Sequence, residues 1–219
     1  MSVIQIANHS TIVTDGSLVA HWIIAIGNQL RDVSALCGII TPALIVAGRE
    51  TKAPDGVPTV AILDNPDQAQ ALGYHVDGGA GFVFVAPTMA AGEELSTVLS
   101  HEILEIAFDW PANRWHLDET GVEYAGEICD PVEGTSYNQD GLKVANFVTA
   151  AWFDPRAPLS SRFDFLSTLT APFSIGAKGY VLRRAPGDAN VSTVWGWAVT
   201  DGMRERKASK WKRPAKRMR

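Results

Sequence analysis

Short apolar runs and one long amphipathic segment alternate along the first third of the chain. Residues 2–7 (SVIQIA) have a strand-like pattern, with Ile4 and Ile6 on one face and Gln5 on the other. The segment that follows, residues 14–38, has the pattern of a helix, with Thr14 or Asp15 as a suitable N-cap and Gly38 as a suitable end. We therefore expect a strand that leads into a long helix.

Three further strands are expected before residue 90. Two short β-rich runs, PALIVAG and VPTVAILD, lie on either side of the turn-rich segment RETKAPDG. The segment LGYHVDGGAGFVFVAP has the composition of a turn that leads into a strong strand at residues 81–86. The predicted order is therefore a strand, a helix and three strands.

A second helix is expected after these strands. It begins between Gly92 and Ser96, and it ends near Asp109 because Pro111 disfavours helical geometry at the residue before it. The region after this helix has a different pattern and no regular period. The second helix therefore closes the upper part of the molecule, residues 1–110.

The lower part, residues 111–202, reads as loops with some β-structure. It contains a strand-like run, LKVANFV, and a hairpin candidate, FSIGAKGYVLRR. A chain of this length can form one well-packed domain, which we place at residues 1–202. The mixture of helices and strands in this order predicts an α+β fold.

Basic residues are concentrated at the C-terminal end of the chain. Residues 203–219 contain nine Lys or Arg and one Glu, a local charge of +8; the whole chain is −5, so residues 1–202 carry −13. Such a tail is too poor in apolar side chains to fold alone. It is either a solvated, disordered end or a contact with DNA, an acidic partner or a neighbouring subunit, in which Trp211 could stack on a base. The contact residues would be Arg204, Arg206, Lys207, Lys210, Trp211, Lys212, Arg213, Lys216, Arg217 and Arg219.

No feature of the sequence points to export or to a membrane. Cys37 and Cys129 form neither a disulfide framework nor a CxxC metal site, and the N-terminus lacks the basic start and long apolar run of a signal peptide. The run LVAHWIIAIGNQL is too short and too polar to span a membrane. We expect a soluble, cytoplasmic protein with free thiols.

The predicted second helix carries three ionisable side chains in an apolar stretch. In LSHEILEIAFDWP, residues 99–111, the side chains of His101, Glu102 and Glu105 lie among large hydrophobic ones. A buried carboxylate is unfavourable unless a salt bridge, a hydrogen-bond network or a metal ion pairs with it. Because residues four apart share one face of a helix, His101 and Glu105 could hold one ion together.

This spacing is a variant of the zinc-binding motif H-E-x-x-H. In that motif the histidines bind the metal and the glutamate is the general base, so Glu102 is the expected base and Glu105 replaces the second histidine. A catalytic zinc needs a third protein ligand, and the segment GEICDPVEG offers Glu127 and Asp130. The alternative is a salt-bridge cluster beside ordinary loop carboxylates.

Two nearby acids are expected to play supporting roles. Asp109 lies too far along a straight helix to share the ion, and it would instead cap the helix or bond to a ligand. Glu133, at the end of GEICDPVEG, is a candidate for the same supporting role. Tyr124, Tyr137 and His75 could each donate to an oxyanion, although a structural role is favoured for each of them.

The replacement of a histidine by a glutamate changes the charge of the predicted site. One histidine and two carboxylates neutralise a divalent cation, which two histidines and one carboxylate would leave positive. A less positive centre polarises water less and favours harder cations. We therefore expect one divalent cation, which is zinc in the first place, with Mn²⁺ or Ca²⁺ as alternatives. The other possibility is that the protein keeps the fold but binds no ion and catalyses no reaction.

Several segments resemble known metallopeptidases. The strand GFVFVAP before a helix with HExx(H/E) is similar to the zincin fold, and the spacing from Glu105 to Glu127 resembles that of the gluzincin branch, typified by thermolysin. The segments LGYH, LSHEILE, EICDPVEG, NFVTAAWFDP and LTAPFSIGAKGYV further resemble a phage and bacterial family described as metallopeptidases, over roughly residues 55–185.

This resemblance implies a fold, a ligand set and a substrate site. The fold would be a zincin-like mixed sheet with an active-site helix, followed by an irregular β-containing C-terminal part. His101 and Glu105 would be metal ligands, Glu102 the base, and Glu127 or Asp130 the third ligand. The strand before the helix would pair with an extended peptide, a role that falls to Phe82, Val83, Phe84 and Val85.

Three functions follow from these patterns. The first is a metal-dependent peptidase or other hydrolase. The second is a non-catalytic phage virion or assembly protein on a zincin-like scaffold, with the basic tail on DNA or on a neighbouring subunit. The third is a binding module in which the charged helix face is a salt-bridge network.

Overall fold

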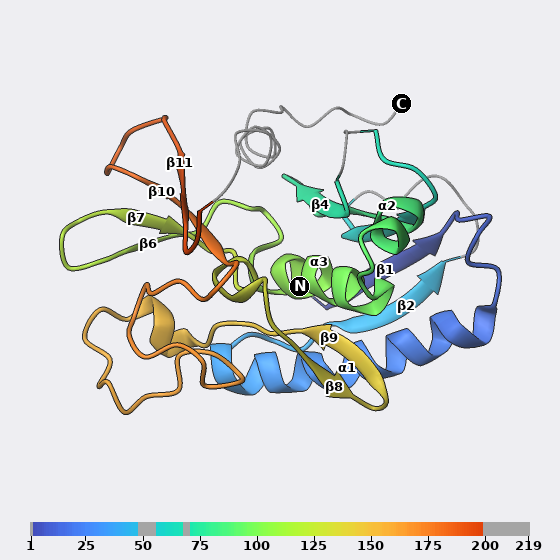
Figure 1. Ribbon diagram of the computed structural model, residues 1–219, viewed down its shortest axis with the longest axis horizontal. Coiled ribbons are helices and arrows are strands. Elements are labelled where there is room, and N and C mark those ends of the chain that lie inside the picture. The colour runs from blue at the N-terminus through green and yellow to red at the C-terminus, as the bar shows by residue number, and fades with distance from the viewer. Residues whose placement is uncertain (1, 48–55, 68–70, 199–219) are drawn as a thin grey trace.

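The structure, a computed structural model, describes residues 2–47, 56–67 and 71–198 (Figure 1). The basic residues of the predicted tail, 203–219, lie outside the described residues. The upper part contains β1 (Val3–Asn8), α1 (Gly16–Cys37), β2 (Ala43–Ala47), β3 (Thr59–Leu63), β4 (Gly73–Val76), β5 (Ala80–Phe84), α2 (Val85–Ala90) and α3 (Leu95–Asp109). The presence of helices and mixed sheets confirms the α+β prediction.

The upper part is built on a mixed five-stranded sheet. Its strand order is β2-β1-β3-β5-β4. The first four strands of this order run parallel, and β4 runs antiparallel to β5. Because β1, β3 and β5 are internal, their apolar residues are buried, as in Ile4, Ile6, Val60, Ile62 and Val83.

Two details of the predicted strands are wrong. The segment Gly73–Val76, which we expected to be a turn, is the edge strand β4. The predicted strand 81–86 ends at Phe84, and Val85 begins α2. Short strands of four residues give little period-two signal, and here pairing with β5 decides the conformation.

The prediction that residues 82–85 bind an extended substrate is also wrong. β5 lies between β3 and β4, and both of its edges are hydrogen-bonded. Phe82, Val83 and Phe84 therefore have no free backbone edge for a substrate strand, and Val85 is helical. The edge strands of this sheet are β2 and β4, and within the described residues β4 pairs with β5 alone.

The two long helices begin and end where the sequence predicts. The Asp15 side chain caps α1 by accepting a hydrogen bond from the Ser17 amide at 2.8 Å, and Gly38 closes the helix in the left-handed conformation. The helix α3 ends at Asp109, immediately before Trp110 and Pro111. Most of its residues are buried, because it is enclosed on several sides.

The lower part consists of short strands, turns and loops. Its elements are β6 (Trp115–Leu117), β7 (Glu123–Ala125), the 3-10 turn η1 (Asp130–Val132), β8 (Ser136–Gln139), β9 (Leu142–Ala145), the 3-10 turn η2 (Ala150–Phe153), β10 (Tyr180–Arg184) and β11 (Ser192–Trp195). Strands β8 and β9 form a hairpin, and the order β11-β10-β7-β6 forms a second sheet. The predicted hairpin within FSIGAKGYVLRR is wrong, because β10 pairs with β7 and β11.

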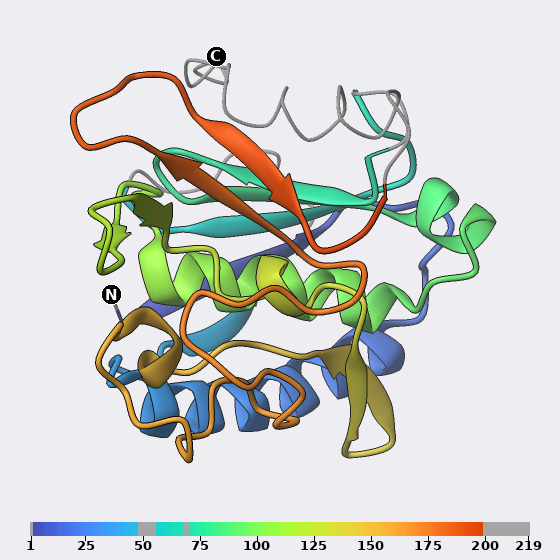
Figure 2. The ribbon, with the colours of Figure 1, turned by 60° about the vertical axis from the view of Figure 1, so that its left-hand side comes forward.

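The helix α3 occupies the middle of the molecule. In Figure 2 it lies between the strands of the five-stranded sheet and α1. Its Ser100 hydroxyl accepts the Ala145 amide of β9 at 2.8 Å, which ties it to the lower part. One connected cluster of buried apolar side chains runs from Ile4 in β1 to Val181 in β10. The upper and lower parts therefore share one core.

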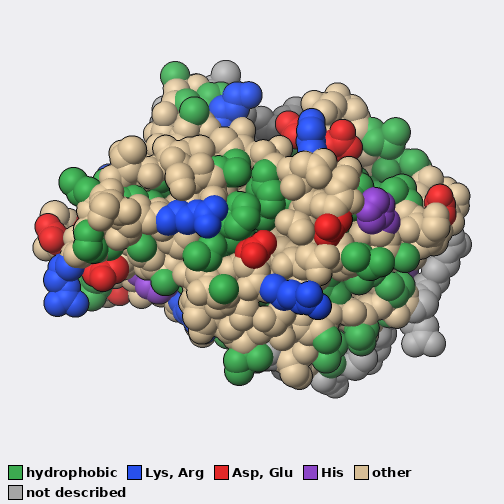
Figure 3. All heavy atoms as spheres, turned by 90° about the horizontal axis from the view of Figure 1, so that it is seen from below, with side chains coloured by type: hydrophobic (Ala, Val, Ile, Leu, Met, Phe, Trp, Pro, Cys, Tyr) green, Lys and Arg blue, Asp and Glu red, His purple; other side chains and the backbone are tan. Residues whose placement is uncertain are grey.

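The face of the molecule seen from below has a mixed surface. Figure 3, which views the molecule from below, shows acidic and basic side chains interspersed with hydrophobic ones on that face. Ile24 and Leu18 of α1 are among the exposed apolar residues. No helix among the described residues is both long and apolar enough to cross a membrane.

Gly179, which leads into β10, packs directly against the carbonyl of Pro131 in η1, and a Cβ at this position would overlap that oxygen. We expect Gly179→Ala to lower the free energy of unfolding by about 1–3 kcal/mol, because backbone must move to relieve the overlap. Gly16→Ala is the control: Gly16 begins α1 and has open space around its Cβ position. Chemical denaturation of both variants measures this, and equal stability of the two would contradict the packing described.

Candidate metal centre

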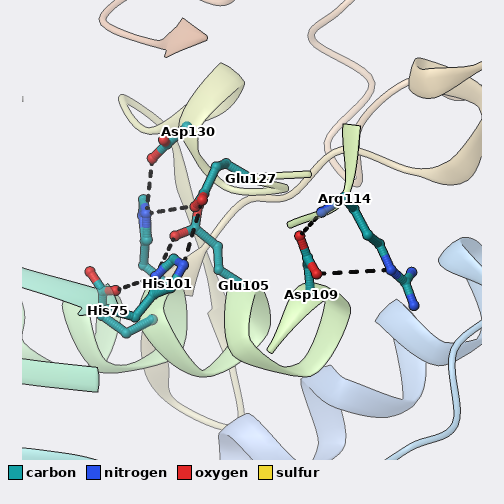
Figure 4. Close-up of polar contacts among 8 residues, drawn as sticks. His75, His101, Glu105, Asp109, Arg114, Glu127 and Asp130 are labelled. Atoms are coloured by element: carbon teal, nitrogen blue, oxygen red, sulfur yellow. Dashed lines mark hydrogen bonds and ion pairs between the residues drawn. The ribbon is translucent and has the colours of Figure 1, made fainter. Parts of the chain in front are cut away.

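The buried face of α3 carries the three ionisable side chains that were expected there, His101, Glu102 and Glu105. Glu102 and Glu105 are 3% and 1% exposed, and His101 lies beside them with a side chain that is 12% exposed. They meet side chains from β4 and from the segment after β7, as Figure 4 shows. Helical geometry alone places His101 and Glu105 on one face, and their closest atoms, Nε2 and Oε1, are 3.2 Å apart.

Asp130 completes a trio with these two residues. Its Oδ1 lies 3.2 Å from Nε2 of His101, and the carboxylate is fully buried. Two ligand atoms bound to one tetrahedral zinc ion at about 2.0–2.1 Å lie about 3.3 Å apart. The spacings of His101 to Glu105 and to Asp130 therefore suit a shared cation, and the ligand atoms of all three lie within 4.8 Å of one another.

Backbone hydrogen bonds hold the segment that carries Asp130. The amide of Val148 donates to the carbonyl of Ile128 at 2.8 Å, and the amide of Gly176 donates to the carbonyl of Pro131 at the same distance. Cys129 is buried between these two anchor points and is a free thiol. Asp130 is thus positioned by the lower part of the molecule, and not by the element that carries His101.

His75 of β4 lies at the centre of a second trio. Its Nδ1 is 3.1 Å from Oε2 of Glu102 and 3.4 Å from Oε2 of Glu105. Its Nε2 faces Oε1 of Glu127 at 3.5 Å. The ligand atoms of His75, Glu102 and Glu105 also lie within 4.8 Å of one another. Both trios are sets of buried His and acidic side chains that could hold a metal ion.

A glycine permits this close approach of β4 to α3. A Cβ at Gly73 would lie 2.9 Å from Cγ1 of Val98 and 3.0 Å from Oε1 of Glu102. Real Cβ atoms are essentially never found so close to a neighbour. The absence of a side chain at Gly73 therefore lets Glu102 reach the strand that carries His75.

The structure separates the two candidates for the third ligand. Asp130 contacts His101, whereas Glu127 contacts His75, so that the predicted alternatives occupy different places in the cluster. His75 itself was only one of three candidate oxyanion donors in the sequence. Because β4 is short and was expected to be a turn, the pattern gave no reason to prefer His75 over Tyr124 or Tyr137.

The remaining predicted residues lie outside the cluster. Asp109 accepts the Arg114 amide at 2.7 Å and faces its guanidinium, so it stabilises the turn after α3 (Figure 4). Glu133 lies at the exposed end of η1. The rings of Tyr124 and Tyr137 pack on aromatic neighbours, Phe173 and Phe165 respectively.

The acidic environment changes the protonation of groups in the cluster. Burial disfavours the charged form of His101, but the charge of Glu105 and the contacts with Asp130 outweigh it and raise the pKa well above the ordinary value of 6.5. Burial also raises the pKa of Tyr180, and the charge of Asp130 adds to this effect. Without a metal ion, the acids around His101 therefore favour its charged form.

A pocket opens beside the cluster. It has a volume of about 360 Å³ and is lined by His75 and Glu127 together with Asn113, Trp115 and Arg184. Arg184 is held in place by Glu123, whose Oε2 lies 2.7 Å from its Nε, and by the ring of Trp115. The pocket thus lies between the edge strand of the upper sheet and the second sheet, next to one end of the cluster.

Comparison of the chain with protein-family models, with curated proteins and with solved structures finds no match in any of the three.

We expect Asp130→Asn to lower the pKa of His101, because it removes one of the negative charges that raise it. NMR titration of the imidazole in the presence of a chelator measures this, with Asp154→Asn, an exposed acid that pairs with Arg156, as the control. Since the folded-state pKa lies above 6.5, the stability contributed by charged His101 is complete below that pH and is lost as the pH rises through the folded-state pKa. An unchanged pKa in Asp130→Asn would contradict the contact.

Proposed function

We propose that this protein is a metal-dependent hydrolase that acts on peptide bonds, with a zincin-like arrangement of its site. The observation that carries the proposal is the trio of His101, Glu105 and Asp130, whose donor atoms are spaced as ligands of one cation. Glu102 follows His101 on the same helix and lies in the same cluster. This combination supports the H-E-x-x-E interpretation of the sequence.

The donor set fits a divalent cation. One imidazole nitrogen and two carboxylate oxygens converge from α3 and η1, and all three side chains are mostly or fully buried. Removal of these carboxylates from water is unfavourable unless positive charge accompanies them. We propose zinc as the ion, with Mn²⁺ or Ca²⁺ as the alternatives that the oxygen-rich set favours.

A bound cation supplies Lewis acidity to water and to the substrate carbonyl. Glu102 is the proposed base: its carboxylate would accept the proton of the attacking water and return it to the leaving amine. His75, 3.1 Å from Oε2 of Glu102, holds that carboxylate in the cluster. Each of these groups is fixed by an element of the fold, so the site would need little rearrangement to act.

The neighbourhood of the site supports an extended peptide as the substrate. The edge of β4 is free within the described residues, and a peptide could add to it as a further strand. His75 belongs to this same strand, so such a peptide would run past the cluster. The adjacent pocket, lined by Trp115 and Arg184, would receive a side chain of that peptide.

We expect Glu102→Gln to keep the cation of the His101 trio and to lower kcat for peptide hydrolysis by about 10²–10⁴-fold, the usual contribution of a general base. His101→Ala and Glu105→Ala should lose the cation and the activity together. Elemental analysis of protein purified without chelator, beside a peptide-library cleavage assay, measures both properties.

The control for this experiment is Glu119→Gln, a surface carboxylate that should change neither metal content nor turnover. Retention of full activity by Glu102→Gln would exclude its role as the base. Failure of the unaltered protein to bind any divalent cation would leave the salt-bridge network as the explanation of the cluster.

A further inference from the structure

We propose that the cluster holds two divalent cations at once, with Glu105 as the carboxylate that bridges them. This inference rests on the proposed function for the first cation, bound by His101, Glu105 and Asp130. It adds a second position, bound by His75, Glu102 and Glu105. The sequence pattern indicates only the first position, because His75 comes from a strand that this pattern does not predict.

The two oxygens of Glu105 face different histidines. Oε1 lies 3.2 Å from Nε2 of His101, and Oε2 lies 3.4 Å from Nδ1 of His75. A carboxylate in this orientation can bind one cation through each oxygen. The side chain is 1% exposed, so its orientation is fixed by the protein. Glu105 is thus the residue that the two trios share.

The donor atoms of the second trio have the spacing of ligands. Nδ1 of His75 lies 3.1 Å from Oε2 of Glu102 and 3.4 Å from Oε2 of Glu105. These values bracket the separation of about 3.3 Å expected for two ligands of one tetrahedral zinc ion. Each position therefore offers one imidazole nitrogen and two carboxylate oxygens.

Glu127 provides an independent indication that His75 is a ligand. The Nδ1 atom of His75 faces Glu102 and Glu105, and its other ring nitrogen, Nε2, lies 3.5 Å from Oε1 of Glu127. Histidines that bind metals characteristically donate their other ring N–H to a carboxylate, which fixes the tautomer and the ring orientation. Glu127, which is 5% exposed, would hold Nε2 protonated and leave the Nδ1 lone pair for the cation.

The number of acids in the cluster is also compatible with two divalent cations. Glu102, Glu105, Glu127 and Asp130 together carry four negative charges when ionised, and all are at most 5% exposed. Ion pairs join these acids to His75 and His101. Two divalent cations with neutral imidazoles would match these four negative charges in number.

Occupation of the second position has a consequence for the proposed mechanism. Glu102 would then bind the second cation, so the proposed role of Glu102 as the base belongs to the protein in which only the first position is occupied. The pocket that His75 and Glu127 line lies beside this second position. The second cation would therefore change both water activation and the surface that a substrate meets.

Titration of the chelator-treated protein with Mn²⁺ tests the inference. We expect two equivalents per chain by equilibrium dialysis. Two ions that share a carboxylate lie about 3.5–4 Å apart, so electron paramagnetic resonance should show an exchange-coupled pair in place of the signal of isolated Mn²⁺. This spectrum is measured on the unaltered chain, so it tests the inference even where a substitution prevents folding.

The variants assign the two positions. His75→Ala and His101→Ala should each bind one equivalent and show isolated Mn²⁺, and Glu105→Ala should lose the coupled signal. His21→Ala, which removes a histidine of α1 that contacts the Asp140 carbonyl, is the matched control and should keep two equivalents. One equivalent that depends on His101 but not on His75 would overturn the second cation and leave the proposed function standing. No bound Mn²⁺, Zn²⁺ or Ca²⁺ would overturn both.

Discussion

The burial of carboxylates beside α3 is the constraint on which the rest of this structure depends. Glu102 and Glu105 belong to a helix whose other residues form the centre of the core, so neither can turn to water without breaking that core. Buried charges require partners within the protein. For Glu102 the partner is His75 of β4. His101 lies between the buried acids of α3 and Asp130 of η1, and it contacts Asp130. The fold is thus organised around one helix and the groups that surround it.

The position of this cluster explains why a site could form here. It lies where the edge of the five-stranded sheet meets the second sheet, and the two sheets leave a pocket between them. An edge strand of the sheet, a pocket and a set of donor atoms are therefore close together. The proposed hydrolase uses all three features: the edge for a peptide backbone, the pocket for a side chain, and the donors for cations.

Glu105 has a central part in both proposals. As the replacement for the second histidine of H-E-x-x-H, it adds a negative charge to the first cation position. A histidine at 105 would offer only one nitrogen on the metal side, whereas a carboxylate offers two oxygens, which here face His101 and His75. The departure from the common motif is therefore what would allow a second cation to share the site.

The sequence by itself determined the features that depend on local geometry. The bounds of α1 follow from Asp15 and Gly38, and the pairing of His101 with Glu105 follows from the period of a helix. Only the tertiary structure decided which distant groups complete the site. The choice of Asp130 as the partner of His101, and the role of His75, depend on strand order and on loops anchored far away in the chain. Hydrophobic period reports how each segment is buried, but not which segment lies beside it, so it does not show that β5 lies between β3 and β4, where the substrate-strand role implied by the resemblance cannot be met.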